Sequence, residues 1–404
     1  MTIAWGSEGQ SSDARPIDNA PAIGAAQAFS ANSELQFRAL EPVWRDLHAR
    51  ASNASPFRTW DFAAEWFRHF VQGKVGGATG RFEIVVAKER SGRVIGLLPM
   101  FEEKSLGADG LGLTLQPFGR THSLESLTDE PVSLLRAGCE AAAVRALSQH
   151  LGRRMRAEKW DIAVVPGEWS GEATGWRSFR YSPRSESAAL TRQVEAPLAI
   201  ELPRTWETFL AGLTKSMRDN IAYYPRRLSR EVGSWSLAIA RSPREVEVAT
   251  EQLIDLHRRR ARAETGIPHH NHLVGEVEAS FVRRWFRRAA ARGEVSIGTV
   301  EARGEVVGVQ AFVEMPGCVS VYYSGYDERY YRYSPLTVIT AHLIRDAIQR
   351  RVTRVEFPPG QALWKARWGA TASLARTEVS VYAVRGTALL RGLSRRLRLL
   401  ARAA

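Results

Sequence analysis

The chain is poor in the residues and runs that mark several large protein classes. Its 404 residues include two cysteines, Cys139 and Cys318, which excludes a disulfide framework and a cysteine-rich zinc site and fits a reducing compartment. No apolar run reaches the roughly 18 residues that a membrane-spanning helix needs. The first residues lack a basic segment followed by an apolar core, so we expect no secretory signal and a cytoplasmic protein.

Several catalytic motifs are missing as well. The sequence has no Walker A motif and no G-x-G-x-x-G, and Gly167–Gly171 has the wrong spacing for a nucleophile elbow. The histidine cluster at 269–272 has no cysteine or suitably spaced acidic residue to complete a metal site. We therefore predict an enzyme or scaffold without a bound metal.

Lysine is scarce, and arginine carries the positive charge. Only six of the 56 basic residues are lysines, yet the net charge is +13 and the pI is near 10.2. Such a charge favours anionic partners such as nucleic acid, phosphorylated substrates or a membrane face. Together with the many alanines, it equally fits a bias in genomic base composition, so both explanations stay open.

One pattern occurs twice along the chain. An apolar hairpin at 82–101, with a turn at Ser91-Gly92, is followed by a helical pattern at 139–157 and a short buried strand at 161–165. The same order recurs as a hairpin at 295–313, a helix at 335–350 and a strand at 353–357. This indicates a tandem duplication in which only the second copy is rich in reactive side chains.

The pattern also predicts the boundaries of the parts. Helices are expected at 34–50 and 59–72, and a Ser- and Pro-containing stretch at 170–195 is typical of a linker. Strands that alternate with helices favour an α/β sheet in each half. The expected parts are a disordered arm at 1–30, a first domain at 31–190, a second domain at 196–386 that includes a last strand at 377–384, and a basic amphipathic tail at 387–404. The tail is suited to peripheral contact with the inner face of a membrane or to packing on its own domain.

The stretch 321–335 is the richest in reactive groups. Ser334 and Pro335 fit the N-cap and first position of a helix, whose first amides and dipole favour an anion. Gly325 permits close approach of the backbone, and Asp327 is a candidate base or orienting group. An ordinary tyrosine-rich strand and loop is the alternative.

Two further stretches bear suitable groups. Lys365 lies between Trp364 and Trp368 after a strand end, where it can stabilise an oxyanion or clamp a phosphate, or can simply be a surface lysine along aromatics. The basic stretch 215–230 suits a phosphate-bearing substrate or a solvated helix face.

These stretches together resemble a known family. Tyr322–Asp327, Ser334-Pro335, Trp364–Trp368 and the basic helix around Arg218 are similar to the CelD/BcsL-type acyltransferases, a branch of the GNAT (Gcn5-related N-acetyltransferase) fold. The resemblance covers roughly residues 30–386, with the first domain similar to a degenerate copy. It implies two tandem GNAT-like domains, each a mixed, mostly antiparallel sheet flanked by helices.

The same motifs are more distantly similar to the Fem-type peptidyltransferases, which use aminoacyl-tRNA. In that group a lysine matched by Lys365 and an arginine matched by Arg218 contact a phosphorylated acceptor. This chain departs from both patterns, with Glu356 for the usual Asp at the strand end and Trp364 for the usual Tyr or Phe. The pyrophosphate loop typical of GNAT proteins is absent, and Pro335 removes one amide donor.

The resemblance implies an acyltransferase that uses acetyl-CoA or another acyl-CoA and acts on an anionic or saccharide acceptor, such as a polysaccharide precursor. The alternatives are a Fem-like transferase that binds tRNA, and a non-catalytic scaffold of a polysaccharide synthesis complex. The expected site residues are Asp327 and Lys365 for catalysis, Arg218, Tyr326, Tyr330 and Trp364 for the acceptor, and Gly325, Ser334, Leu336 and Thr337 for the acyl donor.

Overall fold

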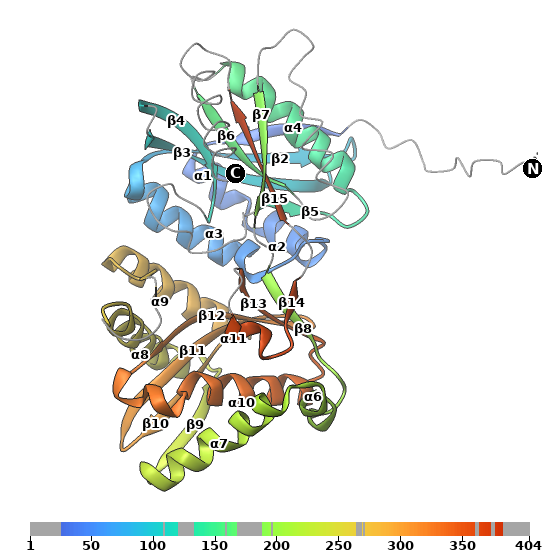
Figure 1. Ribbon diagram of the computed structural model, residues 1–404. Helices are drawn as coiled ribbons and strands as arrows, with labels where there is room; N and C mark the ends of the chain where they lie inside the picture. The colour runs from blue at the N-terminus through green and yellow to red at the C-terminus, as the bar shows by residue number, and fades with distance from the viewer. Residues whose placement is uncertain are drawn as a thin grey trace, which may run out of the picture.

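The molecule has two lobes, each built on its own β-sheet (Figure 1). The computed structural model describes residues 26–107, 110–119, 133–157, 160–167, 188–194, 197–263, 269, 271–359, 363–372 and 376–382. Within those ranges no helix is long and apolar enough to cross a membrane. The tail expected at 387–404 lies outside the described residues, so its membrane contact stays a prediction.

The first lobe has a sheet in the order β1-β2-β3-β4-β6-β15-β7, with β5 paired to β3. Its strands are β1 (Gln27–Ala31), β2 (Ala78–Lys88), β3 (Val94–Gly107), β4 (Gly110–Pro117), β5 (Leu134–Leu135), β6 (Ile162–Gly167), β7 (Ala188–Val194) and β15 (Arg376–Tyr382). Its helices are α1 (Glu34–Ala39), α2 (Glu41–Ala49), α3 (Trp60–Trp66) and α4 (Glu140–Ala157), with the short helical turns η1 (Pro56–Arg58), η2 (Phe67–Gln72) and η3 (Val75–Gly77).

Three expectations for this lobe need correction. The single helix expected at 34–50 is two helices, because the chain turns at Leu40 before Pro42 opens α2. The end of the expected arm, residues 27–30, belongs to β1, which pairs antiparallel with β2. Part of the expected linker, residues 188–194, is β7.

The second lobe has a seven-stranded sheet in the order β14-β8-β13-β12-β11-β10-β9. Its strands are β8 (Pro197–Glu201), β9 (Trp235–Ala240), β10 (Val295–Ala302), β11 (Glu305–Met315), β12 (Cys318–Tyr326), β13 (Arg354–Pro359) and β14 (Thr371–Ala372). Its helices are α6 (Trp206–Gly212), α7 (Lys215–Glu231), α8 (Pro243–Ala261), α9 (Glu276–Ala290), α10 (Pro335–Gln349) and α11 (Leu363–Ala366), with a 3-10 turn η4 (Glu328–Tyr333).

The two sheets match strand for strand, which confirms the duplication seen in the sequence. The unit β2-β3-β4-α4-β6 corresponds to β10-β11-β12-α10-β13. In each unit the last two strands pair in parallel, β4 with β6 and β12 with β13, and the other neighbours in the unit are antiparallel. Both lobes therefore have the mixed, helix-flanked sheet that the sequence predicts.

The last strand of each copy is exchanged between the sheets. After the edge strand β7 the chain enters the second sheet as β8, which pairs with β13. After the edge strand β14 it returns to the first sheet as β15, between β6 and β7. The sequence assigns the strand at 377–384 to the second domain, whereas the structure places it in the first sheet. The rest of the expected domain boundaries stays a prediction.

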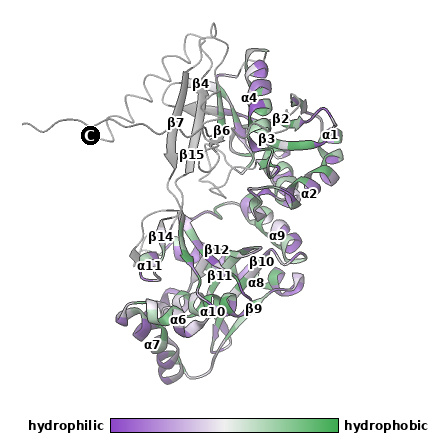
Figure 2. Cartoon of the chain, turned by 90° about the vertical axis from the view of Figure 1, so that its right-hand side faces the viewer, coloured by the Kyte–Doolittle hydropathy of each residue, from purple (hydrophilic) through white to green (hydrophobic). Residues whose placement is uncertain are grey.

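Helices cover both faces of the second sheet. α8 and α9 bury residues such as Leu253 and Phe281 against the face turned toward the first lobe. α6, α7 and α10 bury residues such as Leu228 and Leu343 against the opposite face. In Figure 2 the strands of this sheet are largely hydrophobic, whereas α7 is largely hydrophilic. This pattern is typical of a sheet buried on both faces beneath amphipathic helices.

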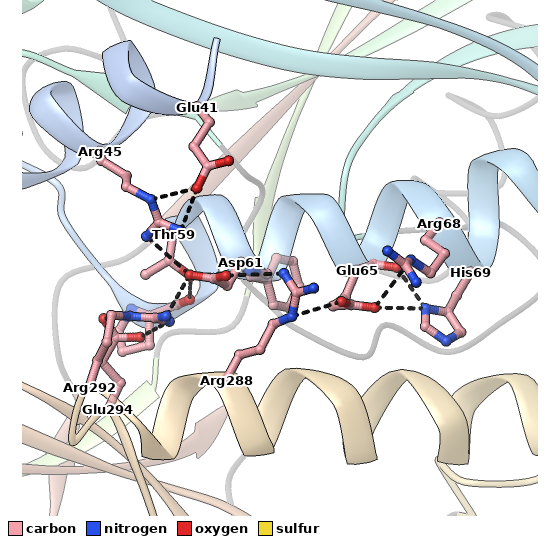
Figure 3. Close-up of polar contacts among 12 residues, drawn as sticks. Glu41, Arg45, Thr59, Asp61, Glu65, Arg68, His69, Arg288, Arg292 and Glu294 are labelled. Atoms are coloured by element: carbon pink, nitrogen blue, oxygen red, sulfur yellow. Dashed lines mark hydrogen bonds and ion pairs between the residues drawn. The ribbon is translucent and has the colours of Figure 1, made fainter. Parts of the chain in front are cut away.

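The lobes meet where α3 packs against α9 (Figure 3). Phe62 of α3 packs edge-on against Trp285 of α9, with ring centroids 5.0 Å apart. Asp61, only 4% exposed, forms ion pairs with Arg288 at 3.3 Å and Arg292 at 2.5 Å. The contact combines an apolar core with buried acids that are neutralised from the other lobe, so separating the lobes would expose both.

Candidate active site in the second lobe

The site is a cleft where two parallel strands move apart. β12 and β13 are paired only from Cys318–Ser320 to Arg354–Glu356, although β12 continues to Tyr326 and β13 to Pro359. Beyond this pairing lies a cleft of about 570 Å³, walled by α7, α8, α10, α11 and the strands β11, β12 and β13. Because strands that separate expose backbone donors and acceptors to the gap, a ligand can pair with them there.

A β-bulge shapes one wall of this cleft. The register between β11 and β12 places Tyr322 and Tyr323 together opposite the single residue Ala311. Such a bulge turns two successive side chains to the same face of the sheet. Their ring centroids are 4.0 Å apart, and the Tyr322 hydroxyl donates to the Tyr323 hydroxyl at 3.2 Å. Both rings line the cleft on the α8 side.

The first turn of α10 forms the opposite wall. Ser334, Leu336 and Thr337 line the cleft, as the sequence predicts for the acyl donor. Ser334 has a φ of 46° and makes no side-chain cap, and the Thr337 amide donates to the Ser334 carbonyl. Pro335 has no amide hydrogen. The helix therefore offers fewer amide donors than expected, and its contribution is the positive end of a 15-residue dipole with two hydroxyl side chains.

Histidines lie on the α8 side of the cleft. The fully buried His257 has its Nδ1 atom 2.9 Å from the Ser324 carbonyl oxygen, and its Nε2 accepts the His272 backbone N–H at 3.2 Å. Since Nε2 accepts, the proton of the neutral ring sits on Nδ1 and is donated to Ser324. His269 Nε2 lies 3.2 Å from the same Nδ1 atom. The ring of His272 stacks on Tyr323 at 5.6 Å.

Lys365 lies at the far end of the cleft on α11. Its side chain is 4% exposed, and its Nζ donates to the Pro358 carbonyl at 2.6 Å, which anchors α11 to the end of β13. The ammonium lies 5.6 Å from the ring centroid of Trp364, which is 40% exposed and also lines the cleft. A buried ammonium of this kind can stabilise negative charge that develops on a substrate oxygen.

Comparison with known protein families identifies this part of the chain. Residues 215–366, from the start of α7 to the end of α11, match the family model of the acetyltransferase (GNAT) domain. The second lobe carries a GNAT domain. The protein is therefore an acyltransferase of the GNAT type, and all the cleft residues named above lie within the matched segment.

Two solved structures share the fold of the GNAT domain and of the lobe before it. A conserved protein of unknown function from Bacteroides thetaiotaomicron is 9% identical, with 88% of this chain and 100% of that chain covered and a TM-score of 0.52. FemX is 8% identical, with 85% and 96% covered and a TM-score of 0.54. At such low identity the likeness concerns the fold alone. No curated protein sequence matches the chain, and the finer CelD/BcsL assignment stays a prediction.

Asp327 does not face the cleft of the GNAT domain as a base would. It is 4% exposed and its carboxylate pairs with Arg329 at 2.8 Å and Arg259 at 2.5 Å. The Arg329 side chain, its backbone N–H and Arg259 lower the pKa of Asp327 from 3.8 to about 2, against the opposing effect of burial. A carboxylate so stabilised is a poor proton acceptor. Its geometry fits the other predicted role, orienting the turn η4, which it caps.

Three more predicted residues lie outside the cleft lining. Arg218 of α7 is exposed and donates to the carbonyl of Leu213, the residue that caps the end of α6. Tyr330 packs against Tyr333, with ring centroids 5.9 Å apart. Gly325 serves helix packing, because a Cβ there would lie 2.5 Å from the backbone of α8. Of the predicted site residues, the structure gathers around the cleft Tyr326, Ser334, Leu336, Thr337, Trp364 and Lys365.

The cleft residues of the GNAT domain that the sequence patterns did not single out include His257 and Arg260. Both continue the buried stripe of α8 that runs through Val246, Ala249 and Leu253. Polar residues at helical spacing on an otherwise apolar face were the available signal. In the described part of the chain, no group of three or more His, Cys, Asp or Glu residues could hold a metal ion.

Proposed function

We propose that the GNAT domain transfers an acyl group from an acyl-CoA, acetyl-CoA in the simplest case, to an amine or hydroxyl of a saccharide or polysaccharide precursor. The observation that carries this proposal is the cleft between β12 and β13. Its walls come from helices on both faces of the sheet, α10 on one and α8 on the other, so two substrates can meet in it.

The α10 side suits the donor. The positive end of α10, with Ser334 and Thr337, favours the pyrophosphate of an acyl-CoA. The acceptor nitrogen or oxygen attacks the thioester carbonyl carbon, the new C–N or C–O bond forms, and the C–S bond breaks to release CoA. The acceptor proton leaves toward the polar α8 wall. Lys365 stabilises the carbonyl oxygen as its charge develops.

The proposed saccharide class rests on the aromatic side chains at the cleft. Tyr331 is 52% exposed and Trp364 is 40% exposed, and both line the cleft. Exposed aromatic faces beside polar groups suit a sugar ring, which has apolar C–H faces and hydroxyl edges. The resemblance in the sequence to CelD/BcsL-type acyltransferases supports the same class.

Calorimetry with the purified full chain tests the donor. Acetyl-CoA and a longer acyl-CoA are expected to bind, and Thr337→Glu is expected to weaken both about 10-fold or more, because it sets a negative charge beside the phosphates. Glu207→Gln on α6 is a matched control, since this exposed position lies outside the cleft lining. The absence of binding by either acyl-CoA would refute the proposal.

A Fem-like transfer from aminoacyl-tRNA is the second candidate. The observation that favours it is α7, which carries Arg226 and Arg230 among its exposed basic residues beside the cleft, in a chain of net charge +13. A polyanion such as tRNA would bind with a strong dependence on salt concentration. Charged tRNA titrated at two salt concentrations, in parallel with acetyl-CoA, separates the two donors.

A further inference from the structure

Arg260 is a partly buried cation in the cleft, and the residues that the structure describes give it no carboxylate partner. Its Nη1 donates to the Ser324 hydroxyl at 3.2 Å, and its guanidinium carbon lies 4.7 Å from the ring centroid of Tyr326. Its Nε is buried and has no hydrogen-bond partner in the described part of the chain. Burial lowers the pKa of this guanidinium, and only the phenols of Tyr326 and Tyr331 act in the opposite direction.

Its two neighbours on α8 are satisfied in other ways. Arg258 donates to the carbonyls of Leu273 and Gly275 at 2.7 and 2.8 Å, which holds the chain that leads into α9. Arg259 forms the ion pair with Asp327. Among the described residues, Arg258 is thus bound by backbone carbonyls and Arg259 by a carboxylate, whereas Arg260 lies in the cleft with neither.

Such an arrangement is unfavourable without a ligand. A guanidinium removed from water costs free energy unless a hydrogen-bonded anion compensates. A charge kept in a cleft under those conditions is typical of a binding site, because the ligand supplies the missing partner. Guanidinium groups are well suited to carboxylate and phosphate, which they bind through two parallel hydrogen bonds.

The position of Arg260 indicates which substrate it meets. It lies on α8, one turn beyond His257, on the face of the sheet opposite α10, where the proposed donor binds. We propose that Arg260 binds an anionic group, a carboxylate or a phosphate, on the acceptor and thereby places the acceptor nucleophile beside the His257 side of the cleft. This inference rests on the proposed function. The residue that recognises the anion is then Arg260 and not Arg218, which is exposed and lies outside the cleft lining.

Calorimetry with three amino sugars tests the site directly. The probes are glucosamine, glucosamine 6-phosphate and muramic acid, which carry no acid, a phosphate and a carboxylate respectively. Arg260→Gln is expected to weaken the acid-bearing probes by about 10- to 100-fold, the usual range for loss of a hydrogen bond to a charged group, and to leave glucosamine unchanged. Arg260→Lys should retain part of the affinity. Arg262→Gln is the matched control, since Arg262 is an exposed residue at the end of the same helix.

Thermal unfolding distinguishes this role from a structural one. Removal of a partly buried cation that has no carboxylate partner among the described residues should leave the melting temperature of Arg260→Gln unchanged or raise it. A fall of several degrees, with equal loss of all three probes, would show that Arg260 is structural and overturn the inference. So would the absence of any binding by the two acid-bearing probes to the unmodified protein.

Steady-state acyl transfer from acetyl-CoA separates the remaining outcomes. A rise in the KM of the acid-bearing sugar with the KM of acetyl-CoA unchanged supports the inference. A rise in the KM of acetyl-CoA alone would assign Arg260 to the phosphates of the donor and overturn it. If acetyl-CoA does not bind the unmodified protein, the proposed function fails, whereas acetyl-CoA binding without discrimination among the sugars refutes only the role of Arg260.

Discussion

Phe57 of the first lobe packs against Tyr322 in the wall of the cleft, with 5.3 Å between the ring centroids. Phe57 is 6% exposed and also packs against Trp285 of α9 at 5.5 Å. All the lining residues that the structure describes belong to the second lobe, so the first lobe acts on the cleft through this contact. Tyr322 stands in the bulge, where a small displacement changes the shape of the site.

We expect Phe57→Ala to lower kcat/KM for acyl transfer about 10-fold, because small displacements of positioning groups have large effects on rate. The same change should destabilise the protein by about 3–5 kcal/mol, the usual cost of truncating a buried phenylalanine. Kinetics at a temperature where circular dichroism shows the variant folded, together with urea unfolding, measure both effects. Phe57→Leu should retain most of the rate. Unchanged kinetics in folded Phe57→Ala would show that the first lobe does not position Tyr322.

Asp327→Asn should affect stability more than chemistry. The pKa of Asp327 is depressed to about 2 in the folded protein from an ordinary value of 3.8, so the carboxylate stabilises the fold above about pH 4. This contribution is lost as the pH falls from about 4 to 2, and solvent screening limits it to on the order of 1 kcal/mol. Unfolding of both proteins between pH 2 and 7 checks the window. A 100-fold loss of turnover at neutral pH, with the fold intact, would instead restore Asp327 as the base.

Lys365→Ala should reduce kcat about 100-fold if the ammonium stabilises the developing oxyanion. Lys365→Arg is expected to recover part of the rate, because it keeps the charge with a different geometry. Lys215→Ala on α7 is the control, since it removes an exposed lysine outside the cleft lining. Steady-state kinetics with acetyl-CoA report the effect. Equal rates for Lys365→Ala and the unmodified protein would show that Lys365 has no catalytic role. Its role would then be structural, through its hydrogen bond to the Pro358 carbonyl.

Removal of residues 376–404 should destabilise the first lobe, although the deletion begins after the last residue of the GNAT domain match. β15 pairs with β6 on one side and β7 on the other, so its loss leaves two unpaired strand edges. We expect amide exchange in β6 to report an opening free energy lower by at least about 2 kcal/mol. Deletion of residues 387–404 alone is the control. Equal protection of β6 in both deletions would contradict the exchanged topology.

The sequence predicts the local parts of this fold well. The hairpins at 82–101 and 295–313, and the strands that follow helices, are visible because alternation and helical spacing are properties of short segments. The destination of the strand at 376–382 is not visible, because the choice between two similar sheets depends on contacts far apart in the sequence.

The residues of the candidate site are likewise predictable only where their signal is local in the sequence. Ser334 and Lys365 stand out in the sequence because a helix start and a lysine between two tryptophans are local signals. Arg260 is one of three consecutive arginines, and no local property distinguishes it from Arg258 or Arg259. Its role depends on the packing of α8 against β12, which turns one of the three into the cleft.

The exchange of β8 and β15 has a consequence for the order in which this protein can fold during synthesis. β15 follows all the strands of the second sheet along the chain, so the first sheet stays incomplete until the second lobe has been synthesised. Domains of most chains fold one after another from the N-terminus as they emerge. Here the first sheet lacks β15 until β8 to β14 of the second sheet have been synthesised. The first lobe is therefore not suited to being produced as a contiguous N-terminal fragment, whereas all the strands of the second sheet lie within residues 197–372.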